Sequence, residues 1–202
     1  YIRHLQMKVR FARWADILNA APPSADLPHA RAIWHYAQGR ALAARGDTAA
    51  AHRHLSELRA IAREPEVAAL RLEFNTVGAL LGIAEKVLAG HIAAARGDAK
   101  AAIAHLREAA RREDALVYGE PPEWSVPVRQ ELGIVLMNAG RNGEAERTFR
   151  DDLKRFPENG WSLHGLAQAL RRQDAREADE IARRWQRAWA SADVKPLVFG
   201  MR

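Results

Sequence analysis

Cysteine is absent from the 202-residue sequence, which excludes a disulfide framework, a thiol nucleophile and a metal site built on cysteine. Lysine is scarce, with five residues among the 31 basic ones, and aromatic residues make up only 7% of the chain. Long hydrophobic runs are also missing. The most apolar run, residues 77–84, ends at Glu85 and Lys86 and is far shorter than the roughly 20 residues of a membrane span. We therefore predict no membrane span.

The charge balance is basic, with 31 basic against 25 acidic residues and a net charge of +6. Two interpretations stay open: a compositional bias toward Arg and Ala, or a basic face that attracts an acidic partner. The lack of cysteine is compatible with the cytoplasm and with the periplasm and decides neither; the cytoplasm is our default, and the periplasm stays open because we expect the N-terminus to be missing. Because the sequence begins at Tyr1 rather than Met, we expect a fragment whose targeting signal lies upstream.

Ala and Leu supply most of the apolar content and β-branched residues are sparse, which favours helices. The clearest helical hairpin covers residues 126–157. Small residues would allow its two helices to cross closely, and a glycine would supply the left-handed residue that ends the first helix. The residues that mark this hairpin are Leu132, Gly133, Leu136, Gly140, Ala145, Phe149 and Pro157.

This spacing within a 34-residue unit resembles the tetratricopeptide (TPR) signature. Four segments, 34–47, 91–98, 119–133 and 157–170, resemble the C-terminal half of a group of uncharacterised bacterial TPR proteins. The resemblance implies an α-solenoid with an interaction role and brings no known activity. In that group the upstream half is richer in histidine. The resemblance therefore implies that any enzymatic or metal chemistry lies in the upstream half.

We predict an all-α, right-handed superhelix of about four TPR-like hairpins. The turn glycines Gly46, Gly97 and Gly140 lie 51 and 43 residues apart, so the array carries two insertions. Turns are expected at 46–47, 97–98 and 140–141, and the sequence leaves open whether 66–96 forms one helix or two. The predicted parts are an incomplete or divergent hairpin at 1–27, repeats at 32–65, 83–116, 126–159 and 160–193 within 28–193, insertions at 66–82 and 117–125, and a tail at 194–202.

Catalytic motifs are not recognisable: the sequence has no Ser/His/Asp arrangement in a known context, no phosphate-binding glycine loop and no HExxH. His52 and His54 are two residues apart on a predicted helix, so they cannot share a metal ion as an i,i+4 pair can. We predict no catalytic, cofactor or metal residues. Two alternatives stay open, an enzyme or metal-dependent module completed by an upstream half and a weak nucleic-acid binder with an Arg-rich face.

The favoured function is a non-catalytic scaffold that binds an unidentified protein or peptide in the concave groove lined by the first helices. Tyr36 and Arg40 stand where the TPR carboxylate clamp has Lys and Asn, so chaperone-tail binding is disfavoured. Tyr36, Arg40, His91 and Asn138 are expected to be exposed. The predicted lining residues are Tyr36, Arg40, Val87, His91, Gln130, Ile134, Met137, Asn138, His164, Gln168 and Arg171.

Tryptophans have two predicted roles. Trp34, Trp161 and Trp185 are expected to pack between helices. Trp124, in the proline-rich loop 117–125, is the candidate for an exposed anchor or for a residue that seals the gap between repeats, because exposed aromatic residues are favoured at binding sites.

Overall fold

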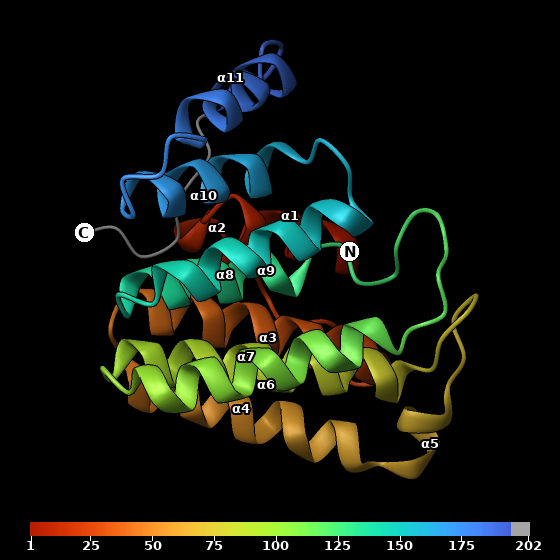
Figure 1. The fold of residues 1–202 in the computed structure, drawn as a ribbon. Helices are drawn as coiled ribbons and strands as arrows, with labels where there is room; N and C mark the ends of the chain where they lie inside the picture. Colours follow the sequence, from red (N-terminus) through yellow and green to blue (C-terminus); the bar gives the residue numbers. More distant parts are fainter. Residues whose placement is uncertain (195–202) are drawn as a thin grey trace. The chain divides into compact units, whose positions relative to one another are not determined.

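The computed structural model describes residues 1–194 as α-helices joined by turns (Figure 1). Within that range there are eleven helices and no strand, which confirms the all-α prediction. The chain forms two compact units, 1–126 and 127–202, called unit 1 and unit 2. The sequence predicted one array over 28–193, whereas the division falls directly after the insertion 117–125. Apart from Val194, the predicted tail lies outside the described residues.

Each predicted hairpin is a pair of helices that pack against each other. Unit 1 holds α1 (Ile2–Arg10), α2 (Trp14–Leu18), α3 (Pro28–Ala44), α4 (Thr48–Arg63), α5 (Pro65–Ala69), α6 (Val77–Ala95) and α7 (Ala99–Asp114). Unit 2 holds α8 (Val128–Asn138), α9 (Asn142–Arg155), α10 (Gly160–Arg171) and α11 (Ala178–Ala188).

The hairpin turns follow the predicted chemistry. Gly46, Gly97 and Gly140 have φ values of +84°, +80° and +72°, which a residue with a side chain rarely adopts. After two of these turns, the side chains of Asp47 and Asp98 accept hydrogen bonds of 2.9 Å from backbone N–H groups and so cap α4 and α7. The three predicted turns are therefore confirmed.

The stretch 66–96 contains two helices rather than one. The short helix α5 ends at Ala69, and the chain then reverses through a turn closed by an isolated bridge between Arg71 and Thr76. The hydroxyl of Thr76 accepts a hydrogen bond of 3.2 Å from the N–H of Ala79 and caps α6. The new helix therefore starts at a local capping signal.

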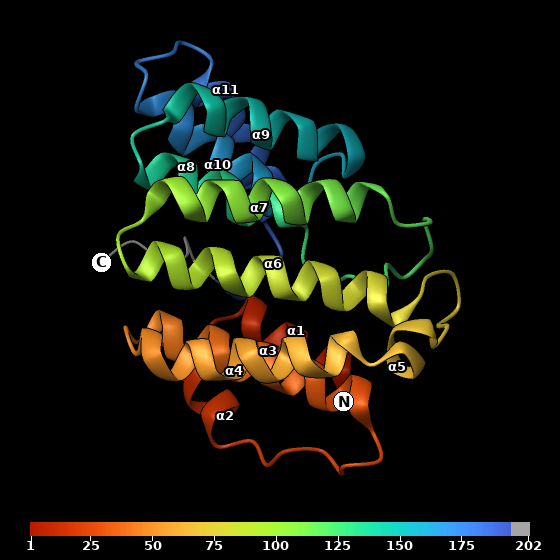
Figure 2. The same ribbon diagram turned by 90° about the horizontal axis from the view of Figure 1, so that it is seen from below.

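The apolar helix α6 forms the centre of unit 1. Its 19 residues are long and apolar enough, by length and composition, to cross a membrane, whereas the prediction of no membrane span rests on the shorter run 77–84. However, 67% of its most apolar window is buried within the structure. Helices α3, α4, α5 and α7 all pack on it, so the packing accounts for its apolar character (Figure 2).

The first helix of a hairpin packs on both helices of the hairpin before it. In unit 1, α3 contacts α1 and α2, and α6 contacts α3 and α4. In unit 2, α10 contacts α8 and α9 in the same way. One packing relation thus recurs at three junctions within the units.

Phe149 on α9 fills the centre of unit 2. Its ring lies against two glycines, Gly133 on α8 and Gly165 on α10, so closely that a methyl group on either glycine would overlap it. The sequence placed Gly133 beside Ala145 at this crossing. Ala145 is buried, but the ring of Phe149 is what requires the glycine.

We expect Gly133→Ala to lower the free energy of unfolding by roughly 1–3 kcal/mol, because added bulk at a close contact forces side chains and backbone to shift. Thermal denaturation followed by circular dichroism measures this change. Gly143→Ala is the matched control, because its methyl group would meet only the ends of two flexible side chains, Gln173 at 3.3 Å and Arg147 at 3.9 Å. Equal melting of the two variants would contradict the assigned contact.

Candidate functional site

Three of the predicted groove residues in unit 1 are part of its core. Tyr36, Arg40 and Val87 are buried, so the expectation that Tyr36 and Arg40 are exposed is wrong. The reason is that α3 is contacted by α1, α2, α4 and α6, which leaves it little free surface. The guanidinium of Arg40 donates a hydrogen bond of 3.0 Å to the hydroxyl of Tyr36, which satisfies part of its polar surface inside the protein.

Gln130 and Met137 in unit 2 are buried too. The amide of Gln130 donates to a carboxylate oxygen of Asp152 at 3.1 Å and to the side-chain oxygen of Asn159 at 3.2 Å. Ser162 also donates to Asp152, and the side chain of Asn159 caps α10. Gln130 therefore helps to satisfy a buried carboxylate, a structural role that the groove prediction did not foresee.

The other predicted lining residues keep some accessible surface. Asn138 and Arg171 are exposed, as expected for Asn138, and His164 packs its ring against Trp185 with centroids 4.8 Å apart. Burial lowers the pKa of His164 below its ordinary value, and nearby Arg171 lowers it further. The accessible or half-buried members of the predicted set are His91, Ile134, Asn138, His164, Gln168 and Arg171.

Trp124 is buried rather than an exposed anchor. Its ring meets that of Tyr36 edge-on, with centroids 5.6 Å apart, so it ties the loop 117–125 to α3 within unit 1. Trp34, Trp161 and Trp185 are half-buried, and the indole N–H of Trp34 donates to the carbonyl of Ala20 at 3.0 Å. The packing of these three agrees with the expectation.

The two insertions, which the sequence marks separately, are joined in the structure. The carboxylate of Glu123 accepts hydrogen bonds from the backbone N–H groups of Glu73, Phe74 and Asn75 at 2.9–3.1 Å. It also accepts one from the Asn75 side chain at 2.6 Å. The Asn75 amide in turn bonds both backbone groups of Val117, at 2.8 and 3.0 Å. These contacts fix the turn 70–76 against the loop 115–127.

This junction holds large apolar side chains at the surface. The exposed fractions are 48% for Leu70, 38% for Leu72, 60% for Val117 and 62% for Tyr118. Among the described residues, only eight large hydrophobic side chains are exposed, so half of them lie here. We call Leu70, Leu72, Val117 and Tyr118 the insertion surface, because all four belong to the two segments that the junction joins. Exposed large apolar side chains are typical of protein-binding sites.

Glu123 is held in its charged form. Burial acts to raise its pKa, but the hydrogen bonds from Asn75 and from the backbone N–H groups outweigh burial and keep the pKa below the ordinary value. The stabilisation from this carboxylate is therefore present above the ordinary pKa and is lost as the pH falls through the lowered one. The only sequence signal for the junction was the excess repeat length at 66–82 and 117–125.

A second titratable cluster links α3 to α4. The Nδ1 atoms of His35 and His54 are 3.0 Å apart, and the ring of Trp34 lies edge-on to both. Burial and the neighbouring His54 lower the pKa of His35 to about 4. The pKa of His54 is lowered too, mainly by burial. A single proton between the two nitrogen atoms explains the short distance, since one must donate and the other accept.

The described part of the chain shows no cluster of side chains that could bind a metal ion. No group of three or more His, Asp or Glu side chains within residues 1–194 is placed to hold a metal ion. Comparison of the chain with protein-family models, curated proteins and solved structures gave no match. The TPR resemblance therefore stays a prediction.

We expect Glu123→Gln to loosen the junction between the insertions, because a neutral amide accepts hydrogen bonds less strongly than a carboxylate does. Hydrogen exchange should become faster at the amides of residues 73–75 and stay unchanged in α3 and α4. Glu120→Gln is the control on the same loop, since the described partner of Glu120 is only the hydroxyl of Tyr118. Unchanged exchange at residues 73–75 in Glu123→Gln would refute the assigned junction.

We also expect the histidine pair to make stability depend on pH. The folded pKa of His35, about 4, lies below the ordinary 6.5, so its stabilisation is complete above pH 6.5 and falls as the pH drops toward 4. At pH 5 the loss should be about 2 kcal/mol. Melting temperatures at pH 7.5 and 5.0 measure it.

His35→Asn should reduce this pH dependence, because it removes the group that resists protonation. His52→Asn, at an exposed position on α4, should leave it unchanged. Charged neighbours modulate the pair, since Glu57 raises the pKa of His35 and Arg31 lowers it. An identical pH profile for wild type and His35→Asn would show that other groups dominate.

Proposed function

We propose that this chain is a non-catalytic, TPR-like protein-binding scaffold in which stacked helical hairpins hold the insertion surface ready for a partner. The observation that carries the proposal is the junction between Asn75 and Glu123. It fixes two loops by side-chain and backbone hydrogen bonds and leaves Leu70, Leu72, Val117 and Tyr118 exposed. Loops already held in place lose little conformational freedom on binding, which favours affinity.

The helix packing supports a scaffold of this kind. Each first helix contacts both helices of the preceding hairpin within a unit, the relation through which repeat proteins extend a core by stacking. The proposal includes the right-handed superhelix of the TPR type. It also retains the accessible first-helix residues as further contact candidates: His91, Ile134, Asn138, His164, Gln168 and Arg171.

The test is affinity capture with the full chain, followed by mass spectrometry and by measurement of the dissociation constant of each captured protein. We expect Leu72→Ser combined with Tyr118→Ser to weaken at least one such complex tenfold or more, because apolar anchors carry most of the energy of small interfaces. That loss corresponds to about 1.4 kcal/mol. The melting temperature should hardly change, since both side chains are exposed.

Leu27→Ser combined with Val194→Ser is the matched control, because both residues are exposed and apolar but lie outside the insertion surface. It should leave binding within twofold of wild type. Complexes that survive the Leu72/Tyr118 double substitution unchanged would move the binding site elsewhere, and the accessible first-helix residues would be tested next.

A further inference from the structure

The two connections that carry the insertion surface are acidic in a chain that is basic overall. The connections 64–76 and 115–127 contain a single basic residue, Arg71, against five glutamates, which gives them a net charge of −4, whereas the whole chain carries +6. The glutamates are Glu64, Glu66, Glu73, Glu120 and Glu123. Acidic charge is therefore concentrated where the exposed apolar side chains lie.

Both connections lie at one end of unit 1. Helices α4 and α7 run from the turns at Gly46 and Gly97 toward this end, and α6 runs back from it (Figure 2). Four of the five glutamates are exposed; Glu123, which holds the junction, is the half-buried one. The adjacent Arg111 and Arg112, near the end of α7, are both paired with Glu108. Those two arginines are thus already engaged.

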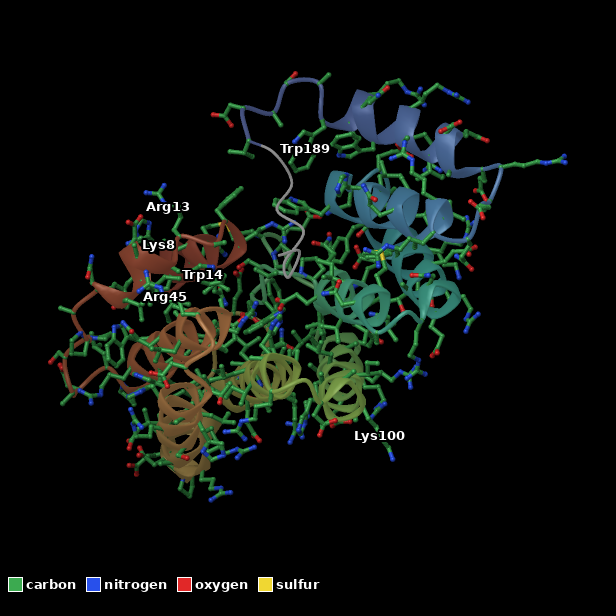
Figure 3. The ribbon with its side chains drawn as sticks, turned by 90° about the vertical axis from the view of Figure 1, so that its left-hand side faces the viewer. Lys8, Arg13, Trp14, Arg45, Lys100 and Trp189 are labelled. Atoms are coloured by element: carbon green, nitrogen blue, oxygen red, sulfur yellow. The ribbon has the colours of Figure 1, made fainter. Side chains whose placement is uncertain are left out.

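The opposite end of unit 1 carries the hairpin turns. Figure 3 looks onto that side and labels the basic residues Lys8, Arg13, Arg45 and Lys100 there, of which Arg13 is paired with Asp16 at 2.7 Å. The capping carboxylates of Asp47 and Asp98 at these turns are occupied by backbone N–H groups. Acidic residues therefore prevail within the two connections, while the ends of α4 and α7 that lead into them carry Arg63, Arg111 and Arg112.

We propose that the insertion surface binds a cationic amphipathic segment of a partner protein, with Lys or Arg beside an apolar face. The inference rests on the proposed scaffold function and adds the chemistry of the partner. Apolar side chains of the segment would cover Leu70, Leu72, Val117 and Tyr118, while its cations would face the exposed glutamates. Complementary charge of this kind speeds encounter and selects the partner, and apolar burial supplies the affinity.

The experiment uses the full chain and three fluorescein-labelled synthetic helical peptides of equal length, in which Leu is combined with Lys, Gln or Glu in the same amphipathic pattern. Fluorescence anisotropy should show that the Leu/Lys peptide binds at least tenfold more tightly than the Leu/Gln peptide at 50 mM salt. The Leu/Glu peptide should bind most weakly. Raising the salt to 300 mM should reduce the preference for Lys over Gln, because ions screen exposed charges.

Substitutions locate the effect. Glu66→Lys combined with Glu73→Lys should weaken the Leu/Lys peptide at least tenfold, and Leu72→Ser combined with Tyr118→Ser should weaken it similarly. The matched control is Asp179→Lys combined with Glu180→Lys, which reverses two exposed acidic residues on α11 and should change binding by less than twofold. Equal weakening by the control would overturn the proposal, because the attraction would then come from charge anywhere on the chain.

Other results would overturn the inference while separating it from the proposed function. If the Leu/Gln or Leu/Glu peptide binds as well as Leu/Lys and only Leu72→Ser/Tyr118→Ser abolishes binding, the surface binds protein but does not select cations. Binding by none of the peptides also overturns the inference, and the capture experiment alone then decides the scaffold function. Concentration-dependent dimerisation in sedimentation that Glu66→Lys/Glu73→Lys abolishes would make a second copy of this chain the occupant.

Discussion

Close approach of helices at glycine is the contact on which both units depend. In unit 2 the ring of Phe149 occupies the space that Gly133 and Gly165 leave open. In unit 1, a methyl group on Gly90 would lie 2.9 Å from Cγ of Leu106, and one on Gly39 only 2.7 Å from Cδ2 of Leu88. The first of these contacts joins the helices of one hairpin, and the second joins successive hairpins. Side chains at these glycine positions would overlap their neighbours and force the helices apart. The loops at the helix ends would then lose their fixed positions.

Local signals explain why the fold could be predicted. A glycine with positive φ and an aspartate that caps the next helix act within a few residues, so the turns at Gly46, Gly97 and Gly140 could be read directly from the sequence. The same holds for Asn159, which caps α10. Where the glycine is missing, Ala12 and Asp174 take positive φ values of +50° and +52°, so the turn geometry is kept despite the residue.

The site was harder to predict because it depends on contacts between distant residues. Tyr36 and Arg40 occupy positions that a repeat template places at the surface, but α3 has neighbours on several sides and buries them. Arg40 is charged, which suggests an exposed position, but it can be buried because Tyr36 accepts one of its hydrogen bonds inside the core. Glu123 and Asn75 are 48 residues apart, and neither belongs to a motif. The sequence shows only that the segments 66–82 and 117–125, which contain these two residues, are insertions relative to the 34-residue repeat.

The junction between Asn75 and Glu123 also has a consequence for the order of folding. Hairpins of neighbouring helices close short loops, whereas this junction brings together residues separated by more than a whole hairpin. We therefore expect it to form after the rate-limiting step, once α6 and α7 are packed. Contacts that form late slow unfolding without speeding folding. The paired loops would then slow the unfolding of unit 1. The lifetime of the folded unit would depend on the hydrogen bonds between its two insertions.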